Sequence, residues 1–112
     1  MRVPKRGLLV AAFLLAFASG SLVETARAAD PAPAKARMCQ NCHGEDGVAV
    51  VPGAANLAGQ QKEYLIEQLR AFRDGRRQNP QMSVVAKSLT DDDIEELSDW
   101  YSSIRVTVEK PK

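Results

Sequence analysis

The stretch MCQNCHGEDG, residues 38–47, contains both cysteines of the chain, Cys39 and Cys42, and its only histidine, His43. Two residues separate the thiols, and the imidazole follows the second thiol directly. Cysteine and histidine are common metal ligands, and cysteine also supplies redox chemistry. We therefore treat this stretch as the candidate functional site and consider the rest of the chain in relation to it.

The residues ahead of this stretch have the three parts of a secretory signal peptide. Basic residues near the N-terminus precede an apolar run at 8–18, and Ala26-Arg27-Ala28 offers small residues at alternate positions to a signal peptidase. The apolar run is well short of the roughly 20 residues that a membrane-spanning helix needs. We expect export to the periplasm, cleavage after Ala28 and no stable membrane anchor; an uncleaved anchor is the alternative.

Cleavage divides the chain into a signal peptide (1–28), a single domain (29–104) and a polar C-terminal tail (105–112). The formal net charge falls from +1 to −2, because the signal peptide contains four basic residues and one acidic residue. A nucleic-acid-binding domain would be strongly basic, so no nucleic-acid partner is expected. A domain this small buries little apolar surface and usually depends on a disulfide, a metal or a cofactor.

Three simpler uses of a Cys-x-x-Cys pair each leave part of the stretch unexplained. A short-range disulfide, which an exported protein can form, assigns no role to His43. A thioredoxin-like redox site follows a strand in a βαβ unit, and no strand pattern precedes Met38. A structural zinc site needs four ligands, whereas the chain offers two thiolates, one imidazole and at best a carboxylate. All three interpretations remain open, but none of them accounts for the whole stretch.

Covalent haem attachment gives a role to all three side chains at once. Each thiol forms a thioether with one vinyl group of the porphyrin, and the adjacent imidazole coordinates the iron. Two intervening residues match the separation of neighbouring vinyl groups on one helical turn. The stretch therefore predicts one covalently bound haem c, with Cys39 and Cys42 as attachment sites and His43 as the proximal iron ligand.

Methionine is the expected second axial ligand, because the chain has no other histidine. Met1 leaves with the signal peptide, and Met38 lies on the side of the haem that His43 occupies. Met82 remains, after Pro80, which cannot continue a helix because it lacks an amide hydrogen. We predict that Met82 is the distal ligand; the alternative is that it fills the core. A thioether donor favours ferrous iron and completes the coordination.

Helical patterns surround the candidate site, and no segment has a convincing strand pattern. Asp30 and Pro31 suit the cap and first residue of a helix that reaches the cysteines. A helix from Gln61 to Asp74 is expected to end at Gly75, and Thr90 is expected to cap the last helix. The apolar stripes that define the middle and last helices consist of Leu65, Leu69 and Phe72, and of Ile94, Leu97, Tyr101 and Ile104, with Asp93 completing a capping box.

Four motifs follow one another along the chain: C-Q-N-C-H-G, N-L-A-G-Q-Q-K-E-Y-L, N-P-Q-M and L-T-D-D-D-I-E-E-L-S-D-W-Y-S-S. Through them the chain resembles the small bacterial class I cytochromes c, and it looks most like one half of the periplasmic di-haem cytochromes c. The resemblance covers nearly all of residues 37–103. It implies a compact all-α fold of three to four helices around one covalently attached haem, with the same ligands, His43 and Met82, and the same thioether cysteines.

One position departs from the pattern of that family. The family usually has a proline two residues before the leucine of L-A-G-Q, and the carbonyl of this proline accepts the second N–H of the proximal histidine. Here the position is Ala55. A carbonyl survives any substitution, so the hydrogen bond that orients His43 can persist, whereas the restraint that the proline ring provides is absent.

These features together indicate a one-electron carrier of the periplasm, in a respiratory chain, between redox proteins such as a dehydrogenase or a terminal oxidase. The alternative is a permanent haem-bearing electron-transfer subunit of a periplasmic dehydrogenase complex, and a gas-binding or peroxidase-type haem protein comes third. No residues of an enzymatic active site are expected. Four arginines at the end of the middle helix either stabilise that helix or bind a haem propionate or an acidic partner: Arg70, Arg73, Arg76 and Arg77.

Overall fold

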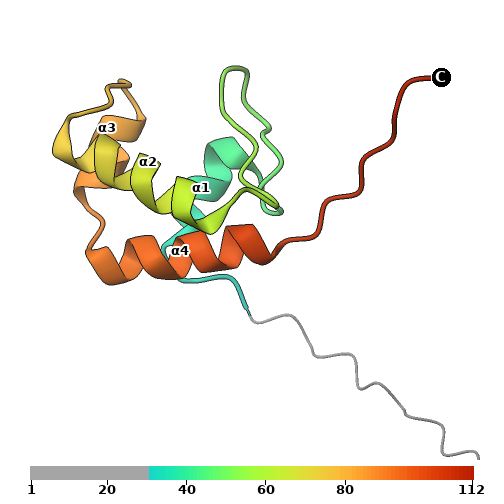
Figure 1. Ribbon diagram of the computed structural model, residues 1–112. Coiled ribbons are helices and arrows are strands. Elements are labelled where there is room, and N and C mark those ends of the chain that lie inside the picture. Colours follow the sequence, from blue (N-terminus) through green and yellow to red (C-terminus); the bar gives the residue numbers. More distant parts are fainter. Residues whose placement is uncertain (1–30) are drawn as a thin grey trace, which may run out of the picture.

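The computed structural model describes residues 31–112, so the predicted signal peptide and its cleavage site lie outside the described residues. Within this range the chain forms four α-helices and no strand (Figure 1). The helices are α1 (Ala36–His43), α2 (Lys62–Asp74), α3 (Met82–Lys87) and α4 (Asp91–Ser103). The all-α fold class predicted from the sequence is confirmed. None of the helices in the described residues is long and apolar enough to cross a membrane.

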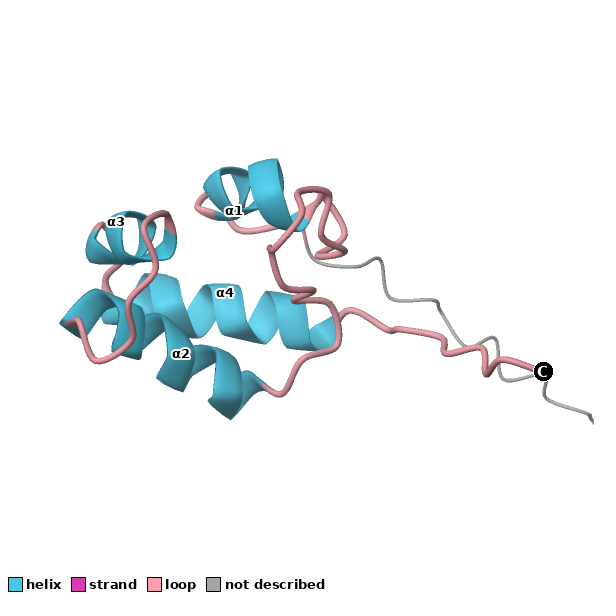
Figure 2. Cartoon of the chain, turned by 90° about the horizontal axis from the view of Figure 1, so that it is seen from above, coloured by secondary structure: helices cyan, strands magenta, loops and turns pink. Residues whose placement is uncertain are grey.

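Helix α2 packs against both α3 and α4 and so holds the C-terminal half of the chain together. In the view of Figure 2, α1 and α3 lie on one flank of α4, and α2 lies on the other. The long loop between α1 and α2 is bonded to the end of α1, and residues after α4 have no regular structure (Figure 1). The two elements that contain the predicted haem ligands therefore lie on the same side of α4.

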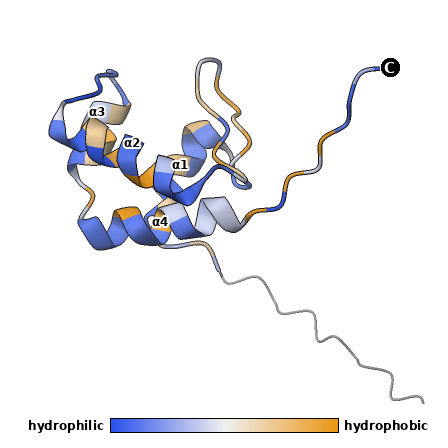
Figure 3. Cartoon of the chain, in the orientation of Figure 1, coloured by the Kyte–Doolittle hydropathy of each residue, from blue (hydrophilic) through white to orange (hydrophobic). Residues whose placement is uncertain are grey.

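The core lies where the apolar stripes of α2 and α4 meet each other and α1. Ile94 and Leu97 are 0% and 1% exposed, respectively. Leu65, Phe72 and Tyr101 are also buried, while Leu69 and Ile104 pack against this cluster and are partly buried. The predicted stripe of α2 is confirmed, and that of α4 is confirmed up to Tyr101; Ile104 lies beyond the last residue of α4 in extended geometry and packs against the core from there. The hydropathy colouring of Figure 3 shows hydrophilic residues over the outer surfaces of α2 and α4, and apolar residues in the exposed loop at 48–51.

The ends of α2 and α4 follow the local signals in the sequence. Gly75 follows α2 with φ 80° and ψ 2°, a left-handed conformation that glycine adopts without the steric cost of a Cβ atom. At the start of α4, the Thr90 hydroxyl accepts from the Asp93 N–H, and the Asp93 carboxylate accepts from the Thr90 N–H. Hydrogen bonding to Thr90, above all from its backbone N–H, holds the pKa of Asp93 below its ordinary value. The predicted capping box is confirmed.

The start of α1 differs from the sequence-based expectation. A helix was predicted from Pro31, whereas α1 begins at Ala36, five residues later. Pro33 explains the difference, because a proline biases the residue before it, here Ala32, towards extended geometry. The carbonyl of Pro33 accepts a hydrogen bond from the Ala36 N–H at 2.9 Å, and this turn leads the chain into the helix.

The arginine cluster forms ion pairs with acidic residues of α2 and α4. Arg73 lies 2.8 Å from the Asp91 carboxylate, and Arg70 pairs with Asp91 and Glu95, so both arginines tie α2 to α4. Arg76, which follows α2, pairs with Glu67 of that helix at 2.6 Å. Exposed ion pairs contribute little stability one by one, and several together restrain the angle between two helices. The arrangement favours the structural interpretation of the cluster.

Candidate functional site

Helix α1 contains three of the four predicted site residues. Cys39 and Cys42 are three residues apart and therefore lie on the same face of the helix, one turn from each other. Both are free thiols and partly buried, and burial raises the pKa of the Cys39 thiol. Cys39 packs against the core cluster that includes Tyr101 of α4. The helix thus presents two reduced thiols at the edge of the core.

The imidazole of His43 is buried and fixed by one hydrogen bond. His43 is the last residue of α1 and is 8% exposed. Its Nδ1 lies 2.6 Å from the carbonyl oxygen of Ala55. A carbonyl oxygen only accepts, so Nδ1 is the donor of this hydrogen bond. Nε2 is therefore the ring nitrogen that remains to bind a metal, and the bond persists without a proline at position 55.

A network of loop hydrogen bonds holds the Ala55 carbonyl in place. The side-chain carbonyl of Asn56 accepts from the Ala49 N–H at 2.8 Å and closes the loop across seven residues. The Leu57 N–H donates to the carbonyl of Gly47 at 2.7 Å. Sequence reasoning missed the role of Asn56; its only signal was an amide side chain next to the position that accepts from His43. These loop hydrogen bonds restrain the backbone at Ala55, where the family usually has a proline ring.

Glycine is required directly after the imidazole. Gly44 has φ 78°, and a Cβ atom there would collide with the carbonyl oxygen of Val48. The chain can therefore reverse immediately after His43, and the Val50 N–H then donates to the carbonyl of Cys42 at 3.0 Å. This reversal brings the loop back over the end of α1, where it can reach the imidazole.

Restoring the proline at position 55 is expected to stabilise the protein. Within the described residues, the Ala55 N–H donates to no acceptor, so Ala55→Pro removes no hydrogen bond. The substitution should raise the free energy of unfolding by about 0.4–1 kcal/mol, because it restricts the unfolded chain. Denaturant unfolding of the holoprotein measures the change. The control is Ala58→Pro, which removes the hydrogen bond from Ala58 to Gly47 and should lower stability. A loss of stability in Ala55→Pro would contradict the expectation.

Met82 lies at the start of a helix rather than in the loop expected from the sequence. It is the first residue of α3 and is partly buried. The side-chain oxygen of Asn79 accepts from the N–H groups of Gln81 and Met82, at 3.0 and 2.9 Å, so the turn before α3 is already ordered. The structure thus brings three predicted site residues together on α1 and presents the fourth from a separate short helix, on the same flank of α4 (Figure 2).

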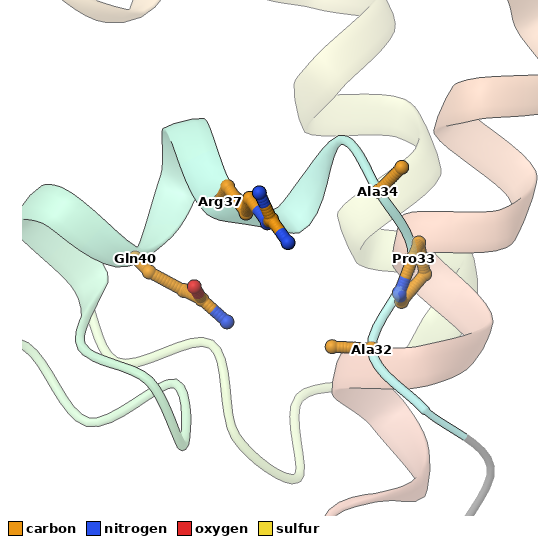
Figure 4. Close-up of a pocket in the computed structure, with 5 residues that line it drawn as sticks. All are labelled: Ala32, Pro33, Ala34, Arg37 and Gln40. Carbon is orange, nitrogen blue, oxygen red and sulfur yellow. The ribbon is translucent and has the colours of Figure 1, made fainter.

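A surface pocket beside α1 does not involve the predicted site. Figure 4 shows Arg37 and Gln40 of α1 facing the segment that leads into the helix. The lining residues are Ala32, Pro33, Ala34, Arg37 and Gln40. None of them is a thiol, an imidazole or a thioether. The pocket is therefore a shallow gap between α1 and the segment before it.

The donor set suits haem c better than a bare metal ion. Across residues 31–112, no three His, Cys, Asp or Glu side chains come together as a group that could hold a metal ion. Two free thiols one helical turn apart, followed by an imidazole whose Nδ1 is engaged by the Ala55 carbonyl, provide what two thioether bonds and one axial ligand require. The spacing of the thiols and the engaged Nδ1 fit a covalently attached porphyrin.

Comparison with known proteins places this site in a family. The family model described as cytochrome c oxidase, cbb3-type, subunit III matches residues 26–100. Cytochrome c4 of Pseudomonas aeruginosa is 32% identical over 100 residues, which are 89% of this chain and 50% of that protein. The thiosulfate dehydrogenase electron acceptor of Thiomonas intermedia is 40% identical over 75 residues, which are 66% of this chain and 35% of that protein. The chain spans half of the length of this cytochrome c4.

A comparison with a solved structure supports the assignment of the fold. The cytochrome c4 of Acidithiobacillus ferrooxidans matches with a TM-score of 0.56 and 38% identity, over 59% of this chain and 38% of that chain. The predicted resemblance to one half of a di-haem cytochrome c and the predicted fold of three to four helices are both confirmed.

Proposed function

Because the chain belongs to the family of cytochrome c domains described as cytochrome c oxidase, cbb3-type, subunit III, we propose that it is a periplasmic mono-haem carrier of single electrons with His43 and Met82 as iron ligands. The family and its relatives make it a protein with covalently bound haem c that carries electrons. The given residues contain one Cys-x-x-Cys-His motif, which supports one haem bound by this domain.

Cys39 and Cys42 are the proposed thioether sites. The observation that carries the proposal is the 2.6 Å contact between His43 Nδ1 and the Ala55 carbonyl, because it leaves Nε2 as the only imidazole nitrogen able to bind iron. Met82 is the proposed distal ligand. Among the methionines of the described residues, Met38 lies on α1 next to the first thiol, whereas Met82 comes from a different helix and can approach from the other side.

Bound haem supplies one-electron chemistry, because its iron is stable in both the ferric and the ferrous state. The described residues control this chemistry in three ways. The carbonyl of Ala55 accepts from Nδ1 of His43 and so orients the imidazole, with Nε2 left for the iron. A methionine sulfur at the sixth position would exclude water and small ligands and would favour the ferrous state. The core residues around Cys39, such as Leu97 and Tyr101, keep solvent from one edge of the site.

Carbon monoxide distinguishes an electron carrier from a gas-binding haem protein. We expect the reduced holoprotein to keep its absorption spectrum under carbon monoxide, because both axial positions are filled. The measurement is a difference spectrum of the dithionite-reduced protein with and without the gas. Rapid formation of a carbon monoxide complex would contradict the carrier proposal and favour a gas-binding or peroxidase-type haem protein.

The second candidate function is a permanent electron-transfer subunit of a periplasmic dehydrogenase complex. The relative of Thiomonas intermedia named as a thiosulfate dehydrogenase electron acceptor favours this candidate. A free carrier docks weakly through a small interface, whereas a subunit stays bound through purification. Purification of the untagged protein from its own cells, at high and low salt, distinguishes the two. A partner present in a stoichiometric ratio at both salt concentrations would favour the subunit.

The proposed mature protein consists of the domain 29–104 and the tail 105–112, after removal of residues 1–28. Residues 105–112 have no helix or strand and are exposed, although a Cβ atom added at Gly59 would meet the side chain of Val106 at 3.0 Å. The intact mass of the protein isolated from the periplasm tests both the cleavage after Ala28 and the attachment of one haem.

A further inference from the structure

We propose that Asn79 is a positioning residue for Met82, because it caps the turn from which the methionine projects. This inference rests on the proposed function, in which Met82 is the distal ligand. In the sequence, Asn79 stood out only as the first residue of the N-P-Q-M motif and as part of a segment that interrupts helices.

Four hydrogen bonds connect Asn79 to the methionine and to the residues on either side of it. Its side-chain oxygen accepts from Gln81 N–H at 3.0 Å and from Met82 N–H at 2.9 Å. Its own N–H donates to the Ser83 hydroxyl at 3.0 Å, and its carbonyl accepts from the Ser83 N–H at 2.9 Å. Asn79 and Ser83 thus enclose the backbone of Met82 from both sides.

Pro80 completes the arrangement rather than breaking a helix. Asparagine is among the best N-cap residues, and proline is favoured at the first helical position, where its missing N–H is not needed. Counted from an Asn79 cap, Met82 is the third helical residue, and its N–H is one of those that need a side-chain acceptor. The segment from 79 to 83 is therefore an ordered helix start that fixes the backbone at the methionine.

Helix α3 depends on this cap more than a longer helix would. It has only six residues, and the residue directly before it, Gln81, provides no side-chain cap. Helices this short are not stable by themselves, so their end groups and packing decide whether they form. Asn79 is exposed, so its side chain contributes hydrogen bonds but little core packing. Truncating it should change the order of the turn and leave the core intact.

Helix α4 offers a matched control. Thr90 is an exposed N-cap whose side chain accepts a hydrogen bond from the third helical residue, Asp93, at 3.1 Å. Asn79→Ala and Thr90→Ala each remove one N-cap, with similar expected costs to the helix. Only the first cap belongs to the turn that contains Met82. A difference between the two variants at the iron therefore reports positioning rather than general stability.

The experiment is a titration of the ferric holoprotein with imidazole, which competes with the methionine for the iron. Displacement of Met82 frees its turn to disorder, so a cap that stabilises the ordered turn opposes imidazole binding. We expect Asn79→Ala to lower the apparent imidazole Kd about fivefold, which corresponds to about 1 kcal/mol. Asn79→Ser, which retains a capping oxygen, should restore the Kd to within about twofold of the wild-type value.

Thr90→Ala should leave the imidazole Kd unchanged while lowering the denaturant midpoint of the protein. Hydrogen exchange of the Met82 amide gives a second readout, and it should accelerate in Asn79→Ala but not in Thr90→Ala. An unchanged Kd in Asn79→Ala, or an equal shift in both variants, would overturn the inference.

The same titration on Met82→Ala separates this inference from the proposed function. If Met82 is the ligand, imidazole binds that variant without competition and far more tightly. If Met82→Ala and the wild type bind imidazole equally, the proposed ligand is wrong and the inference fails with it. If only Asn79→Ala behaves like the wild type, the ligand assignment stands and the positioning role alone is wrong.

Discussion

Met82→Ala is expected to abolish the thioether-to-ferric charge-transfer band of the holoprotein. It should also lower the reduction potential, because a methionine sulfur favours ferrous iron over ferric iron. The reduced variant should bind carbon monoxide, since no protein ligand then fills the sixth position. Absorption spectroscopy of both oxidation states and a redox titration measure these three effects.

Met38→Ala is the matched control for this variant. Met38 lies on α1 and is a partly buried neighbour of the core cluster, so its truncation costs packing. It should lower stability while the charge-transfer band stays. A ferric spectrum of Met82→Ala that is identical to that of the wild type would remove Met82 from the coordination sphere and leave the proposal without a distal ligand.

The second large effect concerns the two thiols. Cys39→Ala combined with Cys42→Ala should eliminate covalently bound haem, because no sulfur remains to form a thioether. The purified chain should be colourless after denaturing electrophoresis and lighter by one haem in its intact mass. Each single variant retains one possible thioether and should keep a reduced amount of haem with an altered spectrum.

Folding should be lost together with the haem. The described domain has a small core, and domains of this size usually require a cofactor, so the double variant should show a weak or absent cooperative unfolding transition. Asn56→Ala serves as a control, because it changes the loop beside His43 but leaves both thiols. Haem that stays bound to the double variant through denaturation would disprove attachment at these cysteines.

The helices that the sequence predicted correctly have complete local signals. Helix α4 has both halves of a capping box and a full apolar stripe, and α2 has a stripe that ends at a left-handed glycine. Helix α3 lacked such signals, since six residues are too few to show a period. Its proline was interpreted as a break, although proline at a first helical position starts a helix.

Some site residues are recognisable from their immediate neighbours in the sequence, whereas others are recognisable only from contacts across the fold. Cys39, Cys42 and His43 are recognisable because the chemistry requires them side by side in the chain. The hydrogen bond from His43 spans twelve residues, and its acceptor at position 55 was expected only through a family resemblance. Asn56 and Asn79 were missed because they act through side-chain hydrogen bonds to loop backbone, and no hydrophobic pattern marks such contacts.

Helix α1 is eight residues long and begins without a side-chain cap. A peptide of that length does not stay helical in water without tertiary packing. Before the chain folds, the segment with both thiols and the imidazole should therefore be open and accessible to the proposed attachment of the porphyrin. We expect attachment at Cys39 and Cys42 to precede the packing of α1 against the core.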